Sequence, residues 1–108
     1  MASQHTNLNA APAMAGIRVT VDYWAQLRDA AGRGSEIVHL PSSCTVTQLL
    51  ARLADLHGEP FRGLLLDEAG RPRRSNLIMI GDRVVATPDS LELPDGVTVV
   101  LLSPLAGG

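Results

Sequence analysis

The sequence predicts an α+β domain in which one mixed sheet is covered on one face by a single main helix. Three observations carry this prediction: an alternating strand that begins at Ile17, an amphipathic helix that begins at Thr45, and a final run, "VTVVLLS", that is apolar on both faces. Alternation with period two is typical of a half-buried strand, whereas a doubly apolar strand belongs in the middle of a sheet. The order of strand, strand, helix and further strands indicates one α+β domain.

The first two strands are expected on either side of a short helical turn. Apolar and polar residues alternate over residues 17–24, which predicts the first strand. The following stretch, "WAQLRDAAG", is rich in helix formers and ends at Gly32. "SEIVHL" then predicts a second strand, which Pro41 ends.

The main helix is the best-specified element. Thr45 and Gln48 match the capping box, which satisfies free amide groups at a helix start. His57 falls in the last turn and Gly58 supplies the stop. Apolar side chains recur at helical spacing and predict one buried face, formed by Val46, Leu49, Leu50, Leu53 and Ala54.

The second half of the domain is expected to be a connection and two or three strands. Residues 60–76, "PFRGLLLDEAGRPRRSN", predict an irregular connection with a turn at residues 68–70. "LIMI" and "RVVA", separated by Gly81-Asp82, predict a hairpin, and Asp95-Gly96 predicts another turn. If the first two strands form a hairpin and the last strand pairs beside the first, four to five strands make a β-grasp.

Bulk composition excludes several classes of protein. A chain of 108 residues fits one domain, and no apolar run approaches the roughly 20 residues of a transmembrane helix. The net charge is -2, all nine basic residues are arginine, and aromatic residues make up 3%. Nucleic-acid binding therefore lacks both its electrostatic attraction and its stacking platforms. The lone Cys44 cannot form an internal disulfide, so we expect a cytoplasmic protein.

The amino-terminal stretch is expected to be a disordered tail. Residues 1–16 contain no periodic apolar pattern and no basic region of the kind that opens a signal peptide. Met14 is an alternative start to Met1. We therefore expect the domain itself to span residues 17–103, followed by a flexible functional tail over residues 104–108.

No constellation of catalytic or metal-binding residues is visible in the sequence. Asp67 and Glu68 are interpreted as solvated charges, and Cys44 as a small structural residue rather than a reactive thiol. The histidines, His5, His39 and His57, show no metal-ligand spacing, so we expect structural roles and no bound metal. Catalysis by this chain alone is not expected.

The ending "SPLAGG" is the most informative stretch for function. Two terminal glycines arise by chance in about one chain in two hundred, given ordinary glycine usage of about 7%. Glycines have no Cβ, so they can extend into a narrow channel. The α-carboxylate that follows them is an anion at neutral pH and can attack the α-phosphate of ATP.

The chain from Ile17 to Gly108 resembles the small sulfur-carrier proteins related to MoaD and ThiS. The segments that carry the resemblance are "YWAQLRDAAG", "LPSSCTVTQLLARL", "SNLIMIGDRVV" and "SPLAGG", in that order. The chain departs from many relatives at Asp95-Gly96-Val97 and at Ser103-Pro104-Leu105. Because of these departures, the resemblance does not identify the docking partner. They do not change the chemistry expected of the terminal carboxyl group.

The resemblance implies a ubiquitin-like β-grasp carrier that is not an enzyme. Gly108 would be adenylated with ATP by a ubiquitin-activating-like adenylyltransferase of the MoeB or ThiF type and then sulfurated to a thiocarboxylate. Gly107 would give an unobstructed approach, while Pro104, Leu105 and Ala106 would set the exit path and contact the partner. No cofactor would be bound by this chain, and zinc would belong to the activating enzyme.

The recipient of the sulfur stays open at this level. The resemblance favours the large subunit of molybdopterin synthase, and carriers for cysteine or thiamin synthesis are alternatives. A ubiquitin-like modifier joined to lysines of other proteins through Gly108 is the second class. A plain binding module with an accidental Gly-Gly ending is the third, and it predicts that removal of Gly108 leaves function unchanged.

Overall fold

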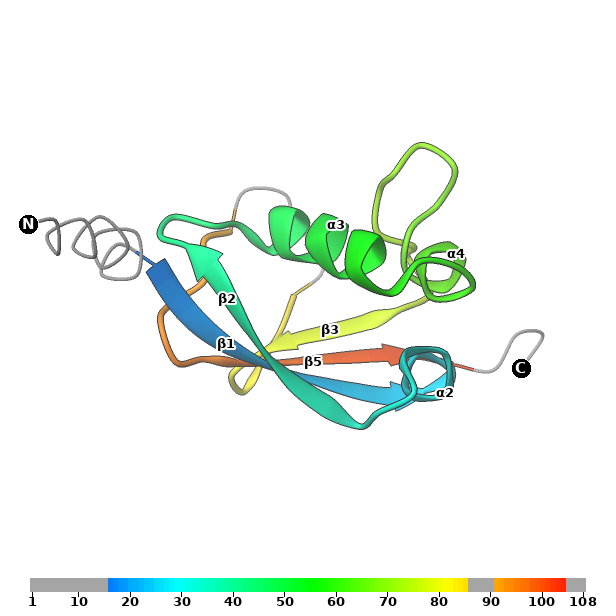
Figure 1. The fold of residues 1–108 in the computed structure, drawn as a ribbon, viewed down its shortest axis with the longest axis horizontal. Coiled ribbons are helices and arrows are strands. Elements are labelled where there is room, and N and C mark those ends of the chain that lie inside the picture. Colours follow the sequence, from blue (N-terminus) through cyan, green and yellow to red (C-terminus); the bar gives the residue numbers. More distant parts are fainter. Residues whose placement is uncertain (1–15, 86–90, 105–108) are drawn as a thin grey trace, which may run out of the picture.

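The computed structural model describes residues 16–85 and 91–104, which form one mixed sheet and three helices (Figure 1). No helix within these ranges has the length and apolar character that a membrane span requires. In chain order the elements are β1 (Gly16–Ala25), α2 (Gln26–Ala31), β2 (Ser35–Pro41), α3 (Val46–His57), α4 (Phe61–Leu65), β3 (Leu77–Ile80), β4 (Arg83–Val84) and β5 (Thr98–Ser103).

The five strands lie in the order β2-β1-β5-β3-β4. β1 and β2 form the expected antiparallel hairpin, whose register runs from Gly16 opposite Pro41 to Asp22 opposite Ser35. β5 lies in the middle, parallel to β1 and antiparallel to β3, as its apolar character on both faces predicts. The predicted β-grasp architecture, a mixed sheet with one main helix across one face, is confirmed.

The hydrophobic core lies between the sheet and α3. Every apolar residue of the predicted helix face is buried, and Leu53 has no exposed surface. From the sheet, alternate residues of β1 and β5 meet this face: Val19, Val21, Tyr23, Val99 and Leu101. The residues that the period-two pattern of the strands predicts to be buried therefore pack against those that the helical period of α3 predicts to be buried.

The start and end of α3 follow the sequence signals. The Thr45 hydroxyl accepts a hydrogen bond from the Gln48 amide at 3.2 Å, and the Gln48 side chain accepts one from the Thr45 amide at 2.8 Å. This reciprocal pair is the predicted capping box. Gly58 ends the helix with φ of 67°, a conformation that glycine adopts without steric cost.

The expected irregular connection at residues 60–76 is wrong at its beginning, because Phe61–Leu65 form α4. Phe61 and Leu65 lie four residues apart, so they share one helix face, and both are buried. Five residues are too few for a hydrophobic period to be recognised in the sequence. The turn at residues 68–70 is present, and the Gly70 amide donates to the Asp67 carbonyl at 2.9 Å.

The remaining turns agree with the prediction. β3 and β4 pair up to Ile80 opposite Arg83, so Gly81-Asp82 is a two-residue hairpin turn. Gly81 and Gly96 have φ of 64° and 82°, which explains why glycine occupies both turns. Ala86, which ends the predicted "RVVA" strand, lies outside the described residues.

Two substitutions on α3 test this packing. Leu53→Ala removes a fully buried side chain and should lower the free energy of unfolding by about 2–5 kcal/mol. Leu56→Ala, the same change where 59% of the side chain is exposed, should alter it by about 0.5 kcal/mol or less. Urea unfolding followed by circular dichroism measures both, and equal losses would contradict the assigned core face.

Candidate functional site

The carboxyl-terminal tail leaves the domain from the middle of the sheet. β5 ends at Ser103, which is buried, and the chain becomes exposed at Pro104. Figure 1 shows this end of β5 beside α2. Of the predicted site residues, Pro104 is placed here, whereas Leu105, Ala106, Gly107 and Gly108 lie outside the described residues.

An apolar row crosses the outer face of the sheet, the face opposite α3, next to this exit. Trp24 of β1 is in register with Leu102 of β5, and Leu102 is in register with Leu77 of β3. Register partners on neighbouring strands point to the same face, so the three side chains lie side by side. Trp24 is 53% exposed and Leu77 is 37% exposed. We call Trp24, Leu102 and Leu77 the outer row.

A second set of apolar residues extends this surface towards β4. Val100 of β5 is in register with Met79 of β3, and Met79 with Val84 of β4. Val84 is exposed. A contiguous apolar surface of this kind on the outside of a domain is typical of a protein-binding site.

Sequence reasoning missed the outer row. The alternation over residues 17–24 predicts Trp24 in the first strand, and the structure confirms it in β1, with α2 beginning at Gln26, but its exposed position was not interpreted as a contact surface. The alternation in the sequence did contain a signal for this surface. Trp24 lies on the same face of β1 as Arg18, Thr20 and Asp22, which is the face turned to solvent. A large aromatic residue on that side indicates a contact surface.

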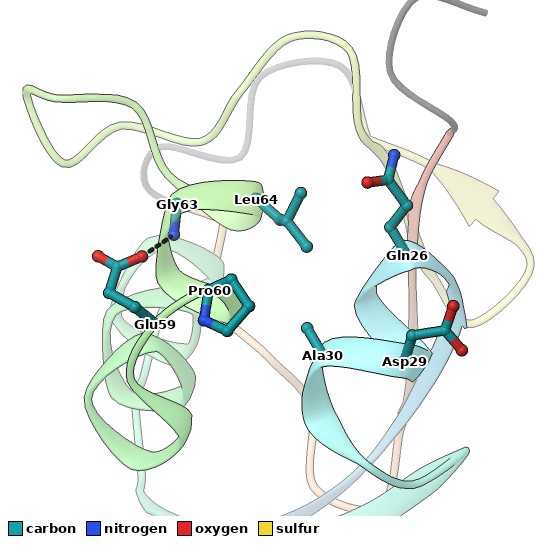
Figure 2. A pocket seen from close by; sticks show the side chains of 7 residues that line it. All are labelled: Gln26, Asp29, Ala30, Glu59, Pro60, Gly63 and Leu64. Atoms are coloured by element: carbon teal, nitrogen blue, oxygen red, sulfur yellow. Dashed lines mark hydrogen bonds between the residues drawn. The ribbon is translucent and has the colours of Figure 1, made fainter.

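A groove lies on the other side of the tail root, between α2 and α4. It has a volume of about 580 Å³, and Gln26, Ala30, Pro60 and Leu64 contribute to its lining. Figure 2 shows the Ala30 and Leu64 side chains facing each other across it, while the Glu59 carboxylate turns to the Gly63 amide, from which it accepts a hydrogen bond at 3.1 Å. Its charged lining residues are two carboxylates, Asp29 and Glu59, with no His or Cys beside them, so the groove holds no reactive cluster.

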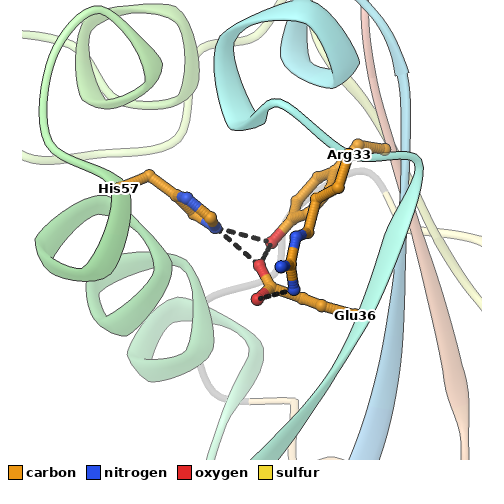
Figure 3. Close-up of polar contacts among 4 residues, drawn as sticks. Arg33, Glu36 and His57 are labelled. Atoms are coloured by element: carbon orange, nitrogen blue, oxygen red, sulfur yellow. Dashed lines mark hydrogen bonds and ion pairs between the residues drawn. The ribbon is translucent and has the colours of Figure 1, made fainter.

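A polar cluster under α3 fastens the helix to the sheet (Figure 3). The Glu36 carboxylate on β2 accepts hydrogen bonds from the Tyr23 hydroxyl on β1 and from Nε2 of His57 at the end of α3, the latter at 2.5 Å. Because an ionised carboxylate only accepts, Nε2 of His57 is the donor in this pair. Arg33 approaches the second carboxylate oxygen at 3.4 Å from an exposed position.

The surroundings of Glu36 change the pKa of two groups. Burial by itself raises the pKa of Glu36, but the hydrogen bonds from Tyr23 and His57 and the nearby charges of His57 and Arg33 outweigh it, so the pKa lies below its usual value. Burial, with the hydrogen bond to Glu36 and its negative charge, raises the pKa of the Tyr23 hydroxyl well above its usual value. The cluster is therefore an ionised carboxylate held between a neutral phenol and an imidazole N–H.

The other candidate reactive residues have structural surroundings. Cys44 is buried, and burial raises the pKa of its thiol, which opposes the reactive thiolate. His57 belongs to the Glu36 cluster, as its structural interpretation predicts, and His39 is exposed on β2. In the described ranges, no three His, Cys, Asp or Glu side chains come together as a metal site would require. His5 lies outside those ranges.

Asp67 differs from its interpretation as a simple solvated charge. Its carboxylate accepts hydrogen bonds from the amides of Ala69 and Arg71, each at 2.9 Å, and so closes the loop after α4. These hydrogen bonds, that of Arg71 first, lower the pKa of Asp67. Glu68 is exposed beside it. The Asp67 carboxylate thus organises the turn.

Neither a protein-family model nor a curated protein sequence matches the chain. Solved structures do match. The small archaeal modifier protein SAMP1 from Haloferax volcanii aligns with a TM-score of 0.74 and 19% identity over 84% of this chain and 99% of its own. A protein named as a candidate molybdopterin converting factor, subunit 1, from Pyrococcus furiosus gives 0.66 and 27% over 82% and 99%.

The match covers 99% of each of these two small proteins, and this chain has the central β5 and the crossing α3 of a β-grasp sheet. The chain is a ubiquitin-like β-grasp domain. A chain of the BexX/CysO complex from Amycolatopsis orientalis shares this fold, with a TM-score of 0.59 and 24% identity over 83% of this chain and 99% of its own. The fold expected from the sequence motifs is confirmed.

Stability of this β-grasp domain should depend on pH through Glu36. Because its folded pKa lies below the unfolded value of about 4.5, its contribution is present above pH 4.5 and is lost as the pH falls through the folded pKa. At pH 7, Glu36→Gln should lower the free energy of unfolding by about 1–3 kcal/mol, because it weakens two hydrogen bonds to a half-buried group. Urea unfolding at pH 7, 5, 4 and 3 measures this difference.

The difference between the two proteins should shrink as the pH falls below 4.5 towards the folded pKa of Glu36. Glu68→Gln, on an exposed side chain, is the matched control and should stay within about 0.5 kcal/mol of the wild type at every pH. A deficit of Glu36→Gln that stays constant from pH 7 to pH 3 would contradict the role of the ionised carboxylate.

Proposed function

We propose that this protein is a sulfur carrier whose Gly108 carboxylate is adenylated with ATP by a partner enzyme of the ubiquitin-activating class and then converted to a thiocarboxylate. The observation that carries the proposal is the "SPLAGG" sequence, which follows directly on the central strand of a ubiquitin-like sheet. The names of the similar structures, which include a modifier, a candidate molybdopterin converting factor subunit and the BexX/CysO complex, support it.

The chemistry needs only the tail from this chain. A carboxylate oxygen of Gly108 attacks the α-phosphorus of ATP, the new P–O bond forms, and pyrophosphate leaves. A hydrosulfide then attacks the acyl carbon and AMP leaves with the electron pair of the broken C–O bond. Glycine at 107 and 108 keeps side chains away from the carboxyl group, so a narrow channel can admit it.

This chain acts as a co-substrate rather than as a catalyst. The side chains of the outer row, of Gln26 and of Pro104 are uncharged, and none of these can act as a general base. Groups that bind ATP and stabilise the developing charge would therefore belong to the activating enzyme, of the MoeB or ThiF type. We place the reaction in the cytoplasm, where the single buried Cys44 stays reduced.

The favoured recipient of the sulfur is the large subunit of a molybdopterin synthase. The "YWAQLRDAAG" segment and the 27% identity to the Pyrococcus furiosus protein support it. A carrier for cysteine synthesis is the alternative that the likeness to a chain of the BexX/CysO complex supports, and a carrier for thiamin synthesis is a further one.

A protein modifier is the second class of function, and the likeness to SAMP1 supports it. A modifier uses the same adenylate but passes the acyl group to a lysine amine of another protein. The chain has no lysine of its own, so it cannot build polymers through internal lysines. Carrier and modifier therefore differ in the nucleophile that meets Gly108 and not in the activation step.

The mass of the carboxyl-terminal tryptic peptide tests the proposal. After incubation with ATP, the activating enzyme of the source organism and a sulfur donor, cleavage after Arg83 releases residues 84–108, which contain no methionine or cysteine. We expect one carboxyl oxygen to be replaced by sulfur. A chain that lacks Gly108 is the control and should stay unchanged.

The other outcomes separate the alternatives. Isopeptide adducts on lysines of foreign proteins would favour the modifier. An unchanged peptide, beside an established carrier that is converted in a parallel reaction, would contradict the carrier and favour the modifier or the binding module.

The outer row supplies the docking surface for the activating enzyme in this proposal. Leu77→Glu places a charge in that surface, so the KM of adenylation for this protein should rise about 10-fold to 100-fold. Leu56→Glu is the matched control on the exposed side of α3, where 59% of the side chain is already exposed, and it should leave KM unchanged. Pyrophosphate release measures both, and equal KM values would remove the outer row from the interface.

A further inference from the structure

One hydrogen bond joins the tail root to α2. The Gln26 side-chain amide donates to the carbonyl oxygen of Pro104, 78 residues later in the chain. Gln26 is the first residue of α2, and Figure 2 shows its side chain beside the end of β5. The contact is possible because Ala25, the last residue of β1, is in register with Ser103, the last residue of β5.

The backbone around Gln26 is held in an unusual conformation. Ala25 has φ of 57° and ψ of -130°, a region that residues with a Cβ rarely adopt. This bend turns β1 into α2 within one residue, so Gln26 starts its helix directly beside β5. Leu27, the next residue, is fully buried and anchors the short helix. Strained backbone of this kind persists where its surroundings fix it, and it is common at functional sites.

The carbonyl of Pro104 is the group through which a hydrogen bond can fix this residue. The ring fixes φ of proline near -65° and removes the amide N–H, so the carbonyl is the only backbone group that Pro104 can offer for a hydrogen bond. The direction of that carbonyl is set by ψ of the same residue. The ring and the Gln26 amide together therefore hold both backbone dihedral angles of the first residue after the sheet.

We infer that Gln26 is a positioning residue that fixes the direction in which the tail leaves the sheet and so presents the Gly108 carboxylate to the activating enzyme. The inference about presentation rests on the proposed function, whereas the inference about direction does not. A tail whose root is already ordered loses less conformational entropy when it enters a partner's channel. Loss of this contact should therefore weaken productive binding and leave the chemical step unchanged.

Two variants and a control test this role. Gln26→Met keeps the length of the side chain and a high helix propensity but cannot donate a hydrogen bond. Gln26→Glu keeps the shape and replaces the donor by an acceptor. Asp29→Asn, on an exposed residue of the same helix, is the control. Unchanged urea midpoints verify that each variant is folded.

The first readout is nuclear magnetic resonance and needs no partner. In both Gln26 variants, the carbonyl carbon resonance of Pro104 should shift, and the heteronuclear Overhauser values of residues 105–108 should fall, while Asp29→Asn matches the wild type. The second readout is adenylation kinetics. The KM for Gln26→Met should rise about fivefold, the usual size for one neutral hydrogen bond, with kcat unchanged.

Each result has one meaning for the inference. An unchanged Pro104 resonance in Gln26→Met would overturn it, whatever the kinetics. A changed resonance with unchanged KM would overturn the presentation of the tail, and a loss confined to kcat would do the same. If wild-type protein is not adenylated at all, the proposed function fails, and the resonance data still decide whether Gln26 directs the tail.

Discussion

The parallel pairing of β1 with β5 is the constraint on which the rest of this structure depends. A parallel pair cannot be joined by a tight turn, so the chain between the two strands must cross from one end of the sheet to the other. Here β2, α3, α4, β3 and β4 all lie within that connection. The pairing also brings the last residues of both strands, Ala25 and Ser103, to the same end of the sheet. An antiparallel pair would have brought the end of β5 beside the start of β1.

The two faces of the sheet differ because of this arrangement: one is buried in the core and the other is exposed. The face that α3 covers buries alternate residues of β1 and β5 and is closed by the Tyr23, Glu36 and His57 cluster. The opposite face has no covering helix in the described part of the chain and carries the outer row beside the tail root. An exposed apolar face costs solubility, so a partner surface is a physical reason for it. Stability and recognition are thereby assigned to opposite faces of one sheet.

The sequence allowed the prediction of features that depend on neighbours in the chain. The capping box of Thr45 and Gln48, the apolar face of α3 and the Gly81-Asp82 turn are all local patterns, and each is present. Two kinds of feature escaped. The helix α4 is too short to show a period, and the hydrogen bonds of Glu36 and Gln26 join residues 21 and 78 positions from their partners. No local pattern encodes contacts of that separation, so only the fold brings them together.

In the described ranges no His, Cys, Asp or Glu side chains gather into a metal site, so the proposed reaction depends on the position of the tail. Activation of a carboxylate by ATP requires charge stabilisation that uncharged side chains such as Trp24, Leu102 and Gln26 do not supply. What the domain can supply is a rigid origin for the tail and an apolar surface beside it. Both features affect how the domain binds a partner. Neither determines which nucleophile then attacks the acyl adenylate. The same scaffold is therefore compatible with sulfur transfer and with attachment to lysine, and the choice between them belongs to the partner that receives the acyl group.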